Sequence, residues 1–269
     1  MPESISDVVV TLRDLAQVLF LDRLSPQRTR ASILACDWCR RLRFHSRAKI
    51  CPLPWPDLFQ KLGVPGVDSV SIPGPLTQFG DVAILEFYYA MGALVKALQP
   101  GTIFEFGTYL GVGALTMAAN TSPDCRIYTM DLPDQAASES VPELNRGDKN
   151  HIAKSRFRVG EAFLRSPYSA RIVQIRDDSM TYRAEKCVTN VDLAVVDGGH
   201  SLPVVTKDTE NALRILSASG TIIWDDYSPY YPDVVKYLDE FANRYEVHAI
   251  PATNYVIYSR KWAGGPGKK

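Results

Sequence analysis

The stretch EFGTYLGVG, residues 105–113, decides the fold of this chain. It completes a short β-rich run, TIFEF, and leads into a helical pattern over 112–119. Glycines at 107, 111 and 113 allow the backbone to turn tightly and to approach a ligand before the helix begins. The spacing differs from the dinucleotide-binding pattern G-x-G-x-x-G, because Tyr109 stands where the second glycine would be. A ligand site is therefore expected here, with a purely structural turn as the alternative.

Four further runs of the same kind follow this stretch. They are 126–130 (RIYTM), 171–175 (RIVQI), 191–196 (VDLAVV) and 221–224 (TIIW). Such nearly continuous apolar runs are typical of strands buried on both faces of a parallel sheet. Helical patterns lie between them, so the sequence predicts a doubly wound, mostly parallel α/β sheet. The last two runs, 246–250 and 255–259, predict an antiparallel hairpin at the sheet edge.

The part before residue 101 differs in character. It predicts helices over 5–21, after Ser25 and over 79–98, with an extended connector through Pro52, Pro54 and Pro56. The predicted organisation is a helical extension over 1–100, which caps the site or makes a dimer contact, a ligand-binding domain over 101–262 and a flexible tail over 263–269. We expect a homodimer or a higher homo-oligomer.

Composition and charge exclude several classes of protein. The 269 residues include 30 Lys and Arg and 30 Asp and Glu, so the formal net charge is zero. That balance argues against a nucleic-acid partner held by a general positive field. Hydrophobic residues make up 46% of the chain, which argues against disorder. We therefore expect a globular protein with a substantial core.

No membrane or export address is evident in the sequence. The most apolar long stretch, 83–98, carries Glu86 and Lys96 and is too short to cross a bilayer. The N-terminus, MPESISDVVV, has acids where a signal peptide needs cations. Five cysteines show no disulfide spacing. We expect a cytoplasmic protein without a membrane partner.

Acidic residues follow the predicted strands, where open parallel sheets bind ligands. Asp131 ends the second strand and can accept hydrogen bonds from a ribose diol; a solvated turn acid is the alternative. Asp178 and Ser179 follow the third strand. Their carboxylate and hydroxyl can hydrogen bond to the amine of an adenine, and capping of a helix N-terminus is the alternative role for the same residues.

The next two strands bring three more carboxylates to the same edge. Asp197 follows the fourth strand, and Asp225 and Asp226 follow the fifth. Acids packed together repel one another unless a cation or protons neutralise them, and a hard divalent ion suits such oxygen donors. Helix capping is the alternative. His200, three residues after Asp197, is a candidate general base.

These motifs together resemble a known family, the class I S-adenosylmethionine-dependent methyltransferases. The segment EFGTYLGVGALTMA at 105–118 is similar to the glycine-rich motif of the catechol and caffeoyl-CoA O-methyltransferases, with Gly113 in place of a final Ser. The segments DGGHS (197–201) and WDDY (224–227) resemble the bacterial macrocin-type sugar O-methyltransferases.

The resemblance implies roles for particular residues. S-adenosylmethionine would be bound by Glu105, Gly107, Thr108, Tyr109, Gly111, Gly113, Asp131, Asp178 and Ser179. Mg²⁺ or a similar cation would be held by Asp197, Asp225 and Asp226, with His200 and Asp197 as the catalytic residues. Relatives often carry Lys at the place of His200 and Asn at the place of Asp226.

The implied reaction is metal-assisted methylation of a hydroxyl on a small molecule, such as a phenol, a sugar or a natural product. The cation would lower the pKa of the hydroxyl, and His200 would take its proton. Metal-independent methylation of nitrogen or carbon is the alternative, followed by a non-catalytic adenosine-ligand binding protein. Tyr227, Tyr230 and Tyr231 follow the acid pair and are candidates for the acceptor pocket.

The N-terminal part contains a second possible metal set. Cys36, Cys39, His45 and Cys51 resemble a list of zinc ligands. On one continuous helix Cys36 and His45 would point in nearly opposite directions, which disfavours a structural zinc. The basic residues over 26–50 fit a solvated face or a subunit contact better.

Overall fold

The computed structural model describes residues 44, 47–73, 85–133, 146–155 and 157–262. The chain divides into two compact units, residues 1–49 and 50–269. The first unit lies almost wholly outside the described residues, and with it the helices predicted over 5–21 and after Ser25, as well as Cys36, Cys39 and His45. The second unit contains the sheet.

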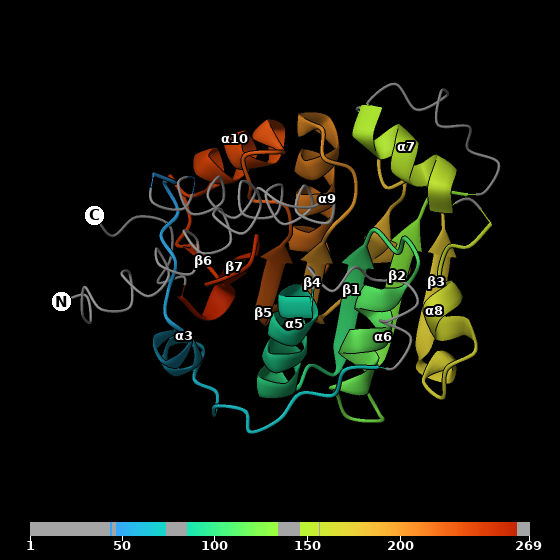
Figure 1. Ribbon diagram of the computed structural model, residues 1–269, viewed down its shortest axis with the longest axis horizontal. Coiled ribbons are helices and arrows are strands. Elements are labelled where there is room, and N and C mark those ends of the chain that lie inside the picture. The colour runs from blue at the N-terminus through green and yellow to red at the C-terminus, as the bar shows by residue number, and fades with distance from the viewer. Residues whose placement is uncertain (1–43, 45–46, 74–84, 134–145, 156, 263–269) are drawn as a thin grey trace, which may run out of the picture. The chain divides into compact units, whose positions relative to one another are not determined.

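The second unit is built on a seven-stranded sheet in the order β3-β2-β1-β4-β5-β7-β6 (Figure 1). The strands are β1 (Thr102–Phe106), β2 (Arg126–Asp131), β3 (Ile172–Arg176), β4 (Val191–Val196), β5 (Leu216–Trp224), β6 (His248–Ala249) and β7 (Val256–Ser259). The first five pair in parallel, and β7 runs antiparallel to both β5 and β6. The predicted doubly wound sheet with its C-terminal hairpin is confirmed.

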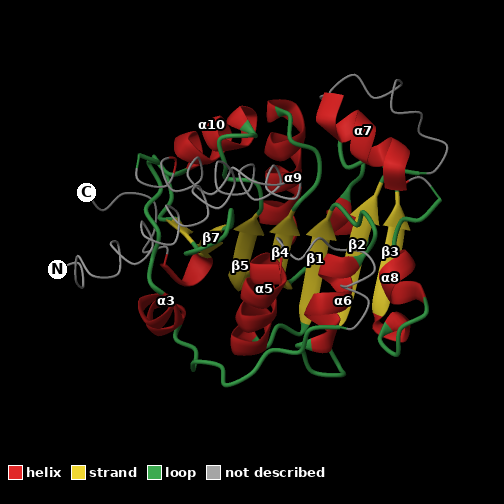
Figure 2. Cartoon of the chain, viewed as in Figure 1, coloured by secondary structure: helices red, strands yellow, loops and turns green. Residues whose placement is uncertain are grey.

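Helices cover the sheet. They are α3 (Trp55–Leu62), α5 (Leu85–Leu98), α6 (Val112–Ala119), α7 (Arg146–Ser155), α8 (Glu161–Leu164), α9 (Leu202–Ile215) and α10 (Pro232–Phe241). In Figure 2, α5 and α6 pack side by side over the face of the sheet turned to the viewer. Helix α9 contacts β4, β5 and α10. Within the described ranges, no helix is long and apolar enough to cross a membrane.

Some elements depart from the sequence prediction. Strand β5 begins at Leu216 rather than at Thr221, because Leu216 pairs with Val191 before the register shifts. Helix α3 lies where an extended connector was predicted. Pro56 is in its first turn, where a helix tolerates proline because no partner for the amide is needed there.

Burial of the strands in the core explains why their sequences are almost continuously apolar. Ile103, Leu193 and Ile223 on three neighbouring strands are fully buried, as in sheets covered on both faces. Leu62 of α3 and Phe87 of α5 belong to the same buried cluster. The compact unit therefore begins at Ile50, whereas the predicted domain boundary lies between α5 and β1.

The turn after β1 brings two backbones into unusually close contact. Gly107 has φ +95°, and a Cβ atom built on it would lie 1.9 Å from the carbonyl oxygen of Asp197, after β4. Its amide donates to the carbonyl of Met130 on β2 (2.8 Å), and the Asp197 amide donates to the carbonyl of Phe106 (2.9 Å). Only glycine fits this junction of three strands.

We expect Gly107→Ala to destabilise the protein far more than Gly63→Ala does. Gly63 ends α3 with φ +67°, and a Cβ there meets nothing within 4 Å. Its substitution therefore adds only left-handed strain, about 1–2 kcal/mol, while a methyl group at position 107 must also push two strand ends apart. Denaturant unfolding of both variants measures the difference, and equal losses of unfolding free energy would contradict the steric argument.

Candidate active site

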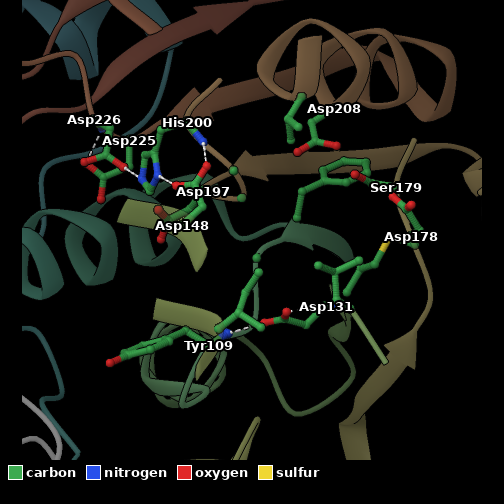
Figure 3. A pocket seen from close by; sticks show the side chains of 18 of the residues that line it. Tyr109, Asp131, Asp148, Asp178, Ser179, Asp197, His200, Asp208, Asp225 and Asp226 are labelled. Carbon is green, nitrogen blue, oxygen red and sulfur yellow. Dashed lines mark hydrogen bonds and ion pairs between the residues drawn. The ribbon is translucent and has the colours of Figure 1, made fainter. Parts of the chain in front are cut away.

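A cavity of about 330 Å³ lies at the carboxyl ends of the parallel strands (Figure 3). Its volume falls in the usual range for small-ligand pockets. Nine of the predicted site residues line it: Gly107, Tyr109, Asp131, Asp178, Ser179, Asp197, His200, Asp225 and Asp226. Four predicted cofactor residues do not line it: Glu105, Thr108, Gly111 and Gly113.

Asp131 organises the glycine-rich loop. Its Oδ2 accepts hydrogen bonds from the backbone amides of Thr108 (3.1 Å) and Tyr109 (2.7 Å), and its Oδ1 accepts one from Leu132 (2.8 Å). Desolvation raises the pKa of Asp131 in spite of these donors. Each carboxylate oxygen can accept two hydrogen bonds, so Oδ1 keeps capacity for a ligand hydroxyl.

Glu105 lies behind the loop. It is only 3% exposed, and its Oε2 accepts a 2.5 Å hydrogen bond from the Thr129 hydroxyl. Burial, with a contribution from the Asp131 charge, raises the pKa of Glu105 to about 8. A Cβ on Gly113 would lie 2.4 Å from Oε1 of Glu105. The residue that replaces the family's Ser is therefore a glycine that makes room for this carboxyl group.

The second wall of the cavity carries the acidic cluster of Asp197, Asp225 and Asp226. The Asp226 amide donates to Oδ1 of Asp225 (2.6 Å). Asp197 lines the cavity beside them. Desolvation there, together with the charges of Asp225 and Asp226, raises its pKa well above the ordinary range. The three acids line one pocket, as the sequence predicts.

His200 lies between two carboxylates (Figure 3). Its Nε2 hydrogen bonds to Oδ2 of Asp226 (2.6 Å), its Nδ1 bonds to Asp148, and its ring stacks on Tyr231 at 4.1 Å. Burial alone would lower the pKa of His200, but these hydrogen bonds and charges outweigh it and raise the pKa to about 10. The ring is an imidazolium at neutral pH. In this arrangement neither nitrogen can accept a proton, so service as a general base would first require the ring to lose one of its two protons.

The sequence comparison settles the enzyme class. Residues 104–227 match the model of a family described as "Methyltransferase domain". The chain contains a methyltransferase domain. The match covers the end of β1 from residue 104, the glycine-rich loop, Asp131 and all three acids of the cluster. The S-adenosylmethionine-dependent methyltransferase predicted from the sequence is confirmed.

Solved structures resemble this methyltransferase only distantly. They include methyltransferase PaMTH1 of Podospora anserina (20% identity, 72% of this chain and 90% of that one, TM-score 0.47). They also include the O-methyltransferase TomG of Streptomyces achromogenes (17% identity, 71% and 90%, TM-score 0.46). Similarity at this level carries no argument about activity. Comparison with curated proteins gave no match.

The predicted metal site can be tested against the donors themselves. The three acids offer only oxygen atoms, the ligands that Mg²⁺ prefers. Asp226, however, is already engaged by His200. Among the residues that the structure describes, no three His, Cys, Asp or Glu side chains are grouped so that they could hold one ion. The donors fit a divalent cation in chemistry, while their present spacing is not that of a formed site.

Several residues of the pocket escaped the sequence analysis. They include Asp148, Met180 and Asp208. Asp148 is 4% exposed on α7, in a segment without any recognisable motif, so nothing in the sequence pointed to its pairing with His200. Of the three tyrosines after the acid pair, Tyr231 lines the cavity, Tyr227 is buried and Tyr230 is 40% exposed.

Glu105→Gln is expected to flatten the pH dependence of stability. The folded-state pKa of about 8 lies above the ordinary 4.5, so the folded protein binds the extra proton between these values. Its stability therefore falls as pH rises through that window, by up to about 1.4 kcal/mol per pH unit. Glutamine keeps an acceptor for Thr129 but cannot ionise.

Denaturant unfolding across the window measures the effect in both proteins. Glu161→Gln is the matched control, because Glu161 is an exposed residue paired with Arg158. Parallel stability curves for the wild type and Glu105→Gln would show that Glu105 is not held neutral.

Proposed function

We propose that this methyltransferase transfers the methyl group of S-adenosylmethionine to a hydroxyl of a small molecule, with the assistance of a divalent cation. One observation carries the proposal: a single cavity joins the loop of Tyr109 and Asp131 to the acidic cluster (Figure 3). The two halves face each other from the ends of neighbouring parallel strands.

The first half suits the methyl donor. Asp131 holds the loop and offers Oδ1 to ribose hydroxyls, and Asp178 and Ser179 line the same side of the cavity, where the adenine would lie. Exposed Tyr109 has φ +47°, which directs its backbone amide onto Asp131. The donor sulfonium is a cation, so an acid-lined cavity favours it.

The second half suits a hydroxyl acceptor. Asp197, Asp225 and Asp226 are the residues that would hold the divalent cation, which when bound lowers the pKa of an acceptor hydroxyl. Burial of the Asp197 carboxyl group, together with the charges of Asp225 and Asp226, raises its pKa. Asp197 also lines the cavity, and a carboxylate of raised pKa is a competent proton acceptor. It shares the predicted catalytic role with His200.

The aromatic lining supports a small-molecule acceptor. Tyr88 and Tyr231 line the cavity beside the acids, and desolvation and the neighbouring carboxylates raise the pKa of both hydroxyls well above their ordinary value. Neutral rings of this kind pack against a phenol or a sugar face. The homodimer expected from the N-terminal part stays a prediction.

The proposal is tested by donor binding and by an acceptor panel. We expect S-adenosylhomocysteine to bind in calorimetry, and one acceptor of the panel to gain a methyl group that mass spectrometry locates on oxygen. Chelation with EDTA should abolish turnover, and Mg²⁺ should restore it. Turnover unaffected by the chelator would remove the cation and favour metal-independent transfer, and a methyl group on nitrogen or carbon would remove the hydroxyl acceptor.

His200→Gln should lower kcat by at least about 100-fold, because a positioned acid–base group usually contributes a factor of this size to the rate. The affinity for S-adenosylhomocysteine should stay unchanged, because His200 belongs to the acidic wall. His248→Gln is the matched control, since His248 pairs with Glu246 outside the cavity. Equal turnover of the wild type and His200→Gln would exclude His200 from the reaction.

A further inference from the structure

Asp208 is a buried acid that neither the sequence motifs nor the proposed chemistry uses. It lies on α9, is 1% exposed and lines the cavity. In Figure 3 its carboxyl group faces the turn of Asp178 and Ser179 and stands apart from His200 and the acidic cluster.

The Asp208 carboxyl group is incompletely paired. Its Oδ1 is buried and has no hydrogen-bond partner among the described residues. Its Oδ2 packs against Gly198, where a Cβ would lie only 2.7 Å away. A buried polar atom without a partner costs roughly 1–3 kcal/mol. A ligand that supplies the missing hydrogen bond would recover this cost.

The surroundings hold this carboxyl group in place. The Ser179 hydroxyl hydrogen bonds to it, and Nδ2 of Asn211, one helical turn along α9, donates to the Ser179 carbonyl (3.0 Å). The turn after β3 and α9 are thereby joined into one corner of the pocket. That corner lies on the side of the cavity opposite the acidic cluster, and a methyl donor with its sulfonium near the cluster would place its base there.

The charge state of Asp208 matches the edge of a purine amine. Desolvation and the nearby Asp178 charge raise the pKa of Asp208 to about 7, against the opposing effects of the Ser179 hydrogen bond and the Lys207 charge. A neutral carboxyl group presents one donor and one acceptor. The Watson–Crick edge of adenine presents the complementary pair, the N1 acceptor and the N6 amine.

We infer that Asp208 binds the 6-amino edge of the adenine of the methyl donor and selects it against purines that lack the 6-amine. This rests on the proposed function, since it requires S-adenosylmethionine to occupy the cavity. The observation that carries it is the juxtaposition of an unpartnered, buried carboxyl oxygen with the turn of Ser179 at the end of the cavity away from the acids.

Calorimetry with two ligands tests the inference: S-adenosylhomocysteine and its 6-deamino analogue, which carries an unsubstituted purine and therefore lacks the 6-amine. The wild type should bind the adenosyl compound at least about 10-fold more tightly, because the analogue leaves the acceptor oxygen of the Asp208 carboxyl group without a donor. Asp208→Leu should bind the adenosyl compound about 10-fold more weakly and bring the two affinities within about twofold. Asp208→Asn should keep the preference, since an amide offers the same donor and acceptor.

Asp192→Asn is the matched control for a merely structural effect. Asp192 accepts hydrogen bonds from the amides of Gly101 and Thr102 at the far end of β4, away from the cavity. It should change stability without changing the ratio of the two affinities.

The outcomes separate the two proposals. Equal affinities in the wild type, or an unchanged ratio in Asp208→Leu, would overturn the role of Asp208 and leave the proposed function standing. A wild type that binds neither ligand would overturn both. If Asp208→Leu fails to fold, the wild-type ratio and its retention in Asp208→Asn still decide the question.

Discussion

The site depends on the contact between the backbones that leave β1 and β4. Gly107 lies so close to the Asp197 carbonyl oxygen that no side chain fits between them. This contact fixes the start of the glycine-rich loop against the strand that delivers Asp197. Asp131, the last residue of β2, accepts hydrogen bonds from the amides of Thr108 and Tyr109. The end of β2 is therefore connected to the same loop. The two halves of the cavity are positioned relative to each other by these few contacts.

Electrostatics is the second constraint on this site. The cavity and its immediate surroundings contain many carboxyl groups, which could not all be ionised at close range without counter-charge. The protein resolves this in two ways. Glu105 and Asp208 are desolvated, which favours their neutral forms. Asp148 and Asp226 instead share the imidazolium of His200. Asp197 is left with a raised pKa and a place on the cavity wall.

Much of this arrangement was predictable because parallel strands are regular. Five apolar runs marked the strands, and the rule that ligands bind at their carboxyl ends singled out Asp131, Asp178, Asp197, His200 and Asp225. All of these line the cavity. The helix α3 was missed because three prolines suggested an extended chain, whereas proline is acceptable in a first helical turn.

The sequence by itself determined the five parallel strands, the enzyme class and the strand ends at which the chemistry is found. The tertiary structure decided which side chains face the cavity and which of them carry charge. Only the packing of α7 and α9 brings Asp148 and Asp208 to the pocket, while Glu105 and Gly113 of the most recognisable motif face each other behind the loop. The reason is physical: strand periodicity and turn geometry are local properties of the chain, whereas desolvation and hydrogen-bond partnership arise only when distant segments pack together.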